Sequence, residues 1–176
     1  MFSQAFIRAI NFVLSPFVEG GLSLDPEDDG NWTGGKKDQG ELRGTKWGIS
    51  AEAYPQLDIG SLTRDDAVLI YWRDYWAKMK GDLLPPRVAL VVFDAAVNQG
   101  VDAAAKMLQR VLGVVIDGDI GPVTLTAARG KEQDDVVVEF LGVRAMRYAS
   151  GDQAKFKRYG RGWMNRLFRA CMEASR

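Results

Sequence analysis

Apolar residues recur at helical spacing over most of this chain. Between Phe2 and Leu14 they form one stripe, and the polar Arg8 and Asn11 lie outside it. This pattern predicts a helix over 2–14. Pro16 follows directly, and a proline removes a backbone donor and clashes with the preceding turn. We therefore expect the first helix to end just before Glu19.

The rest of the pattern predicts further helices after a long irregular stretch. Ser50 and Thr63 suit helix N-caps, Gly100 and Gly113 suit helix ends, and Pro122 suits a first helical position. Together with the apolar periods, these signals predict helices at about 51–54, 63–80, 88–98, 102–112, from 122, 133–149 and 162–174.

Residues 20–48 are rich in glycine and show no helical period. So long an irregular stretch in a small domain is usually functional or contains short strands. The segments 32–35 and 45–50 read as the edges of a small hairpin or sheet. The predicted fold class is therefore mainly α, with one small β element after Glu19.

Composition narrows the chemistry more than it narrows the fold. The 176 residues suit one compact unit with two lobes, which we place at 1–86 and 87–176. The chain has no histidine, and Cys171 is its single cysteine. Histidine-rich zinc sites and Cys-His or Ser-His nucleophiles are thereby excluded. Hydrolytic chemistry must rest on carboxylates, and we expect no metal and no organic cofactor.

The charge distribution and the N-terminus suggest a setting. Residues 1–100 hold 10 basic and 14 acidic residues, whereas residues 101–176 hold 13 and 9. A basic C-terminal segment can face an anionic envelope surface or simply be a solvated helix face. The first residues lack the basic region and the long apolar core of a secretory signal, so we expect the protein to fold in a cytoplasm. We also expect a monomer that binds no nucleic acid.

Glu19 is the first candidate for catalysis. It lies between an apolar run and Gly20-Gly21. An apolar wall disfavours the ionised carboxylate and raises its pKa, as a general acid near neutral pH requires. The glycines allow a sharp turn and leave room for a ligand. A surface glutamate at a helix end is the competing interpretation.

An acidic cluster follows, formed by Asp25, Glu27, Asp28 and Asp29. Glycosidases often pair an acid with a second carboxylate that activates water or stabilises an oxocarbenium-like transition state. Asp28 or Asp29 is the candidate for that role, and a solvated turn is the alternative. Calcium is rejected, because Lys36 occupies the position where a calcium loop needs glutamate.

Other polar and aromatic residues are candidates for holding water or sugar. Thr33 and Thr45 carry hydroxyls that can hold a water. Aromatic faces and amides form the second group: Trp32, Trp47, Tyr54, Asn98 and Gln99. An aromatic face suits a sugar ring and an amide suits an N-acetyl group, although core packing and helix capping explain the same residues.

The ordered motifs resemble glycoside hydrolase family 108. They are Glu19-Gly20-Gly21, the loop 25–30 (DPEDDG) and the segment 45–50 (TKWGIS). The segments 93–100, 117–124 and 162–166 are similar to the peptidoglycan-binding region usually fused to it. Residues 117–124 are also explained as a local turn and a helix start.

This resemblance implies a lysozyme-like fold and an N-acetylmuramidase that cleaves peptidoglycan. It implies Glu19 as catalytic acid, assisted by Asp28 and Thr45, with Asp29 and Thr33 as the alternatives. The resemblance suggests a phage endolysin that acts on the periplasmic wall after release from the host cytoplasm through a separate membrane lesion. A bacterial muramidase assisting secretion, a lytic transglycosylase and a non-catalytic wall-binding module remain open.

Overall fold

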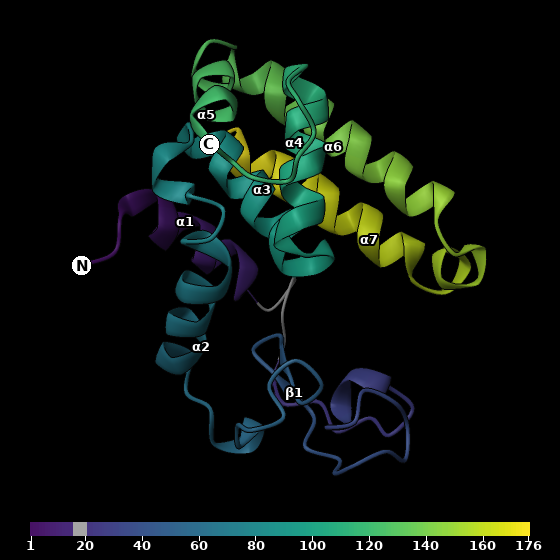
Figure 1. Ribbon diagram of the computed structural model, residues 1–176. Helices are drawn as coiled ribbons and strands as arrows, with labels where there is room; N and C mark the ends of the chain where they lie inside the picture. Colours follow the sequence, from purple (N-terminus) through teal and green to yellow (C-terminus); the bar gives the residue numbers. More distant parts are fainter. Residues whose placement is uncertain (16–20) are drawn as a thin grey trace. The chain divides into compact units, whose positions relative to one another are not determined.

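The chain is mainly helical with one small antiparallel sheet, which confirms the predicted fold class. The structure is a computed structural model that describes residues 1–15 and 21–176 (Figure 1). It divides into two compact units. Unit 1 comprises residues 1–9 and 71–176, and unit 2 comprises residues 10–70. The lobe boundary at 86/87 stays a prediction.

Unit 1 is built around a central helix. Helix α3 (Pro86–Gln99) contacts α4 (Val101–Leu112), α6 (Gln133–Ser150) and α7 (Gln153–Ala174), and the shorter α5 (Pro122–Arg129) packs on α4 and α6 (Figure 1). Residues 88–96 of α3 are buried throughout. All of them are apolar except Asp94, so this helix can be surrounded by neighbours at the cost of one buried charge.

Aromatic rings join the N-terminal residues to the rest of unit 1. Phe6, from helix α1 (Gln4–Val13), packs against Trp76 and Phe93 with ring centroids 5.3 and 5.9 Å away. Trp76 belongs to a π-helical turn, η3 (Trp72–Trp76), and is almost fully buried. The tilted and edge-on ring pairs are the arrangements that aromatic side chains prefer.

Unit 2 is mostly loop, held by short elements. In its described residues the end of α1 is followed by 3₁₀ turns, a hairpin and nearly all of helix α2: η1 (Asp29–Asn31), β1 (Thr45–Lys46), β2 (Ile49–Ser50), η2 (Ile59–Ser61) and α2 (Arg64–Tyr71). In the hairpin Thr45 pairs with Ser50 and Lys46 with Ile49. Trp47 and Gly48 form its two-residue turn, both with positive φ, as the twist of a tight hairpin requires.

Several elements differ from the sequence prediction. The predicted strand at 32–35 is a single bridge between Trp32 and Leu42. The helix expected over 63–80 leaves α geometry after Tyr71, and the one expected at 51–54 is only a turn. Helix α7 begins at Gln153 rather than at 162, because Asp152 caps it. Among the described residues, no helix combines the length and apolarity needed to cross a bilayer.

Candidate active site

Glu19 lies outside the described residues, which resume at Gly21. Its role as catalytic acid therefore stays a prediction. The other predicted site residues fall into two groups. Asp28, Asp29, Thr45, Trp47 and Tyr54 belong to unit 2, whereas Asn98 and Gln99 belong to unit 1. Each group is described within its own unit.

Asp28 caps a 3₁₀ turn through only one of its two carboxylate oxygens. It is the N-cap of η1, and Oδ1 accepts a hydrogen bond of 3.0 Å from the backbone N–H of Gly30. The side chain is exposed, and the structure records no partner for Oδ2 among the described residues. One oxygen thus fixes the carboxylate while the other has no recorded partner among the described residues, which is compatible with a role toward water or a sugar cation.

Asp29 is engaged in shaping the loop. Its Oδ1 accepts from the backbone N–H of Lys37 at 2.9 Å, across eight residues. Asn31, which is fully buried, anchors the same loop by donating from Nδ2 to the carbonyl of Asp25 at 2.9 Å. These bonds give the acidic cluster a defined conformation instead of a freely solvated turn.

Backbone hydrogen bonds join the Asp28 loop to the residues on either side of the Thr45 hairpin. The carbonyl of Asn31 accepts from the N–H groups of Arg43 and Gly44, each at 3.0 Å, and the carbonyl of Gly30 accepts from Glu52 at 3.1 Å. The motif segments 25–30 and 45–50, fifteen residues apart in sequence, are thus parts of one folded unit.

The two candidate threonines differ in what their hydroxyls do. Oγ1 of Thr33 accepts from the backbone N–H of Glu41 at 2.9 Å, and this bond closes the loop between them. Thr45 is half-buried in β1, and its backbone pairs with Ser23. No hydrogen bond of its hydroxyl is recorded within the described part of the chain. A hydroxyl left in this state is available for a water.

Trp47 has a backbone conformation that is rare for a bulky side chain. Its φ is +55° and its side chain is half-buried, as is that of Tyr54. Left-handed backbone in such a residue costs roughly 1–2 kcal/mol and is often found at functional sites. The hairpin turn places the indole at the tip of the T-x-x-G-I-S segment.

Glu52 is a carboxylate that the sequence analysis did not select. A methyl group added at Gly30 would lie 3.3 Å from Oδ1 of Asp28 and 3.8 Å from Oε2 of Glu52. The two carboxylates therefore flank the same glycine, and Glu52 is exposed. In the sequence, only its position three residues after Gly48-Ile49 connects Glu52 with a motif. In the fold, the backbone hydrogen bond from Glu52 to Gly30 brings it next to the Asp28 loop.

In unit 1, Asn98 and Gln99 end α3 beside a buried ionic cluster. Asp94 has no exposed surface and is bonded to Arg144 and to Arg166, in the latter case at 2.8 Å. Burial raises the pKa of Asp94, but the two guanidinium groups outweigh it and hold the pKa below its ordinary value. Asn98 and Gln99 are joined to this cluster through Tyr148 and Arg144.

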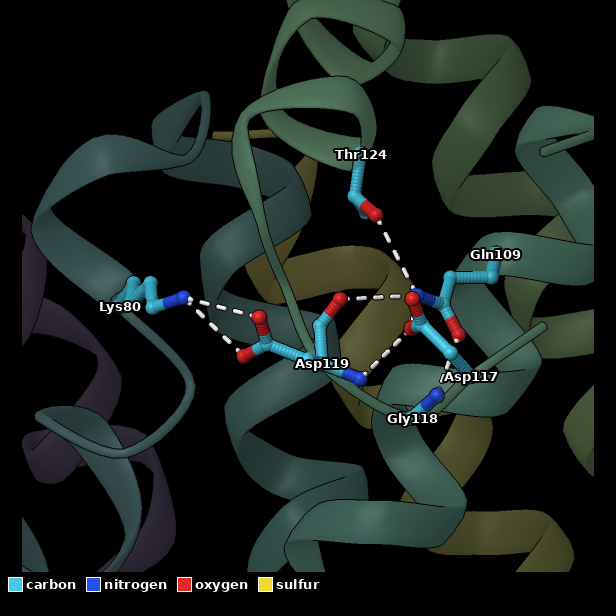
Figure 2. A network of polar contacts seen from close by, with 6 residues as sticks. All are labelled: Lys80, Gln109, Asp117, Gly118, Asp119 and Thr124. Atoms are coloured by element: carbon cyan, nitrogen blue, oxygen red, sulfur yellow. Dashed lines mark hydrogen bonds and ion pairs between the residues drawn. The ribbon is translucent and has the colours of Figure 1, made fainter. Parts of the chain in front are cut away.

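The segment 117–124 is a turn closed by one buried glutamine (Figure 2). Nε2 of Gln109 donates to Asp117 Oδ1 at 2.6 Å and to the carbonyl of Asp119 at 2.8 Å, and Oε1 accepts from Gly118 at 2.8 Å. Lys80 pairs with the Asp119 carboxylate at 3.0 Å. The polar groups of this motif thus satisfy one another, as expected for local structure.

Two surface grooves lie among the described residues of unit 1. One, of about 680 Å³, is lined by residues between Asp82 and Asp134; the other, of about 940 Å³, lies between α4 and α6. Within the described residues no group of three or more acidic or cysteine side chains has the geometry of a metal site.

Comparison with known proteins assigns the chain to a family. The family Glycosyl hydrolase 108 matches residues 11–100, and the Predicted Peptidoglycan domain matches residues 103–168. No curated protein matches the chain. Among solved structures, SagA of Brucella abortus is 33% identical, with 96% of this chain and 92% of that chain covered and a TM-score of 0.79. The chain belongs to glycosyl hydrolase family 108, and it is a glycoside hydrolase that acts on peptidoglycan.

Proposed function

We propose that this protein is an N-acetylmuramidase, which hydrolyses the β-1,4 bond between N-acetylmuramic acid and N-acetylglucosamine. In this proposal Glu19 protonates the glycosidic oxygen. Asp28 orients the attacking water or stabilises the positive charge that develops on the sugar ring, and Thr45 helps to hold the water. Asp29, Trp47, Tyr54, Asn98 and Gln99 contribute to substrate binding.

The observation that carries this proposal is the state of the Asp28 carboxylate. Its Oδ1 is fixed by the N–H of Gly30, while Oδ2 has no recorded partner in the described residues. Backbone bonds join the loop to the residues on either side of the hairpin that holds Thr45. A fixed carboxylate on an exposed side chain and an uncommitted hydroxyl in the same unit suit activation of water. A lytic transglycosylase, which forms a 1,6-anhydro product, has no need of an activated water.

The proposal is tested by the release of reducing sugar from purified cell wall. Removing a general acid typically lowers the rate by about 10²–10⁴-fold, so Glu19→Gln is expected to lose nearly all activity. Glu27→Gln is the matched control, because Glu27 is exposed in the same part of the chain and pairs with Lys37. Equal activity of Glu19→Gln and the wild type would refute the proposal.

We propose phage-encoded host lysis as the biological role, with the enzyme made in the host cytoplasm, working as a monomer, and reaching the periplasmic wall through a separate membrane lesion. Exposed cations at the start of α7 supply a surface for the anionic envelope: Lys155, Lys157, Arg158 and Arg161. Lysis of the host by a gene pair encoding this chain and a membrane-permeabilising protein, but by neither alone, would support this role. A bacterial muramidase assisting secretion would instead be encoded beside secretion genes.

A further inference from the structure

The C-terminal end of α3 carries a continuous chain of polar contacts that the proposed chemistry does not use. Arg144 on α6 has no exposed surface. Its Nη1 donates to Asp94, its Nη2 donates to the hydroxyl of Tyr148 at 3.2 Å, and its Nε donates to Oε1 of Gln99 at 3.1 Å. The Tyr148 hydroxyl in turn contacts Oδ1 of Asn98. All of these residues belong to unit 1.

The direction of each hydrogen bond follows from the guanidinium group. Arginine has five N–H donors and no acceptor, so the oxygen of Tyr148 must accept from Arg144. Tyr148 can then donate its single hydroxyl hydrogen to Asn98, and the amide oxygen of Asn98 must be the acceptor. Burial raises the pKa of Tyr148, although Arg144 beside it acts in the opposite direction. The hydroxyl therefore keeps its hydrogen.

Gln99 is oriented by the same rule. Because Nε of Arg144 can only donate, Gln99 must turn its oxygen toward Arg144 and its NH₂ group away. Both amides at the helix end thus have the oxygen inward and the nitrogen outward. Asn98 is exposed and Gln99 half-buried, and neither NH₂ group has a recorded partner in the described part of the chain.

We propose that Arg144 and Tyr148 are positioning residues that hold Asn98 and Gln99 as a pair of outward donors for the acetamido carbonyl oxygen of the glycan. This inference rests on the proposed function, which makes an N-acetylated glycan the substrate. Two amide donors suit a neutral acceptor oxygen. The buried carboxylate of Asp94 anchors these contacts, because its charge holds the guanidinium group of Arg144 in place.

Binding is measured in the Glu19→Gln background by NMR of the ¹⁵N-labelled protein. Chitotetraose is the probe, and cellotetraose, which has the same linkage with hydroxyls in place of acetamido groups, is the comparison. Chitotetraose is expected to shift the side-chain amide signals of Asn98 and Gln99, whereas cellotetraose leaves them in place. Equal shifts with the two sugars would overturn the assignment of the acetamido group.

A double-mutant cycle tests whether Tyr148 acts through Asn98. Tyr148→Phe removes the hydroxyl but keeps the ring that stacks on Trp163 at 4.7 Å. It should weaken chitotetraose binding about three- to ten-fold, the range of one lost hydrogen bond, and so should Asn98→Ala. Both changes together should weaken it no further. Losses that multiply would show a merely structural role for Tyr148.

Two further variants complete the test. Asn98→Asp changes an exposed side chain and so keeps the test valid if Tyr148→Phe fails to fold, and Tyr159→Phe is the matched control. Asn98→Asp keeps an oxygen for Tyr148 but replaces the outward NH₂ by an acceptor, on an exposed side chain. It should weaken binding at least as much as Asn98→Ala. Tyr159→Phe removes another hydroxyl near Trp163, whose ring centroid lies 6.1 Å from that of Tyr159, and should change nothing.

The outcomes separate this inference from the proposed function. If the wild type releases muropeptides but Tyr148→Phe and Asn98→Asp bind chitotetraose as tightly as their parent, the inference falls and the function stands. If the wild type cleaves no wall while chitotetraose still shifts the Asn98 amide, the function falls and the inference stands. Absence of any shift at Asn98 and Gln99 would overturn the inference in either case.

Discussion

The two units use charged side chains in opposite ways. In unit 1, Asp94 is enclosed and bonded to Arg144 and Arg166, and it fixes three helices. In unit 2, Asp28 and Asp29 remain exposed, and each bonds the backbone of its own loop through one oxygen. A buried ion pair contributes to a specified packing, whereas an exposed carboxylate stays available for chemistry. We therefore expect substitution of the buried charge in unit 1 to act on stability, and substitution of the exposed carboxylates in unit 2 to act on rate.

The largest expected effect is on the buried charge. Asp94→Ala leaves the guanidinium of Arg144 buried without its counter-ion, which typically costs about 3–5 kcal/mol of unfolding free energy. Asp102→Ala is the matched control, because it removes the exposed pair with Lys106 on α4 and should change stability little. Chemical denaturation of both variants measures the difference, and equal stabilities would break the comparison.

The pH dependence of stability gives a second test of the same charge. The pKa of Asp94 is held below the ordinary value by Arg144 and Arg166 despite burial. Its stabilising contribution is thus complete above the unfolded-state pKa of about 3.9 and is lost as pH falls through the lower folded-state pKa. The melting temperature should therefore fall in that acid range for the wild type. Asp94→Asn, already less stable, should show a shallower acid loss.

In unit 2 the expected effect is on rate. Asp28→Asn keeps an acceptor for the N–H of Gly30 and removes only the charge, so the loop should fold unchanged. We expect hydrolysis of peptidoglycan to slow about 100-fold with an unchanged melting temperature. Asp29→Asn, which likewise keeps its bond to Lys37, should retain most of the activity. A larger loss for Asp29→Asn would reverse the two assignments.

A smaller effect is expected from the polar turn of unit 1. Gln109→Leu leaves the buried Thr124 hydroxyl and the half-buried N–H of Gly118 without a partner, and each unsatisfied buried group costs about 1–3 kcal/mol. Asp117 loses one hydrogen bond but keeps the one from the N–H of Asp119. The exposed Gln153→Leu should cost much less. Thermal unfolding measures both, and because Gln109 is structural, hydrolysis by the folded variant should match the wild type. A variant with normal stability and impaired wall binding would make this turn a binding site instead.

Sequence patterns predicted the helical elements better than they predicted the site. Stripes and caps located α3 and α4 to within two residues, because local signals decide those boundaries. The start of α7 was missed: the prediction began the helix at 162, whereas Asp152 caps it and it runs through Gly160 and Gly162, two residues with low intrinsic helix propensity. Gly160 lies against the ring of Phe156.

For the candidate site, residue types and their order could be read from the sequence, but the geometry of the site could not. Asp28 and Thr45 could be selected from motifs, yet only the fold shows that one oxygen of Asp28 is engaged while Thr33 uses its hydroxyl to close a loop. Glu52 was missed because its approach to Gly30 depends on a backbone bond between distant residues. Tyr148 and Arg144 likewise reach Asn98 and Gln99 only through packing of α6 on α3.

The most direct test of the central claim is mass spectrometry of the muropeptides that the wild type and Glu19→Gln release from purified wall. A muramidase releases fragments that end in reducing N-acetylmuramic acid, and Glu19→Gln should release almost none. Fragments ending in 1,6-anhydro-N-acetylmuramic acid, or in reducing N-acetylglucosamine, would contradict the proposed reaction. Undiminished release by Glu19→Gln would contradict the assignment of the catalytic acid.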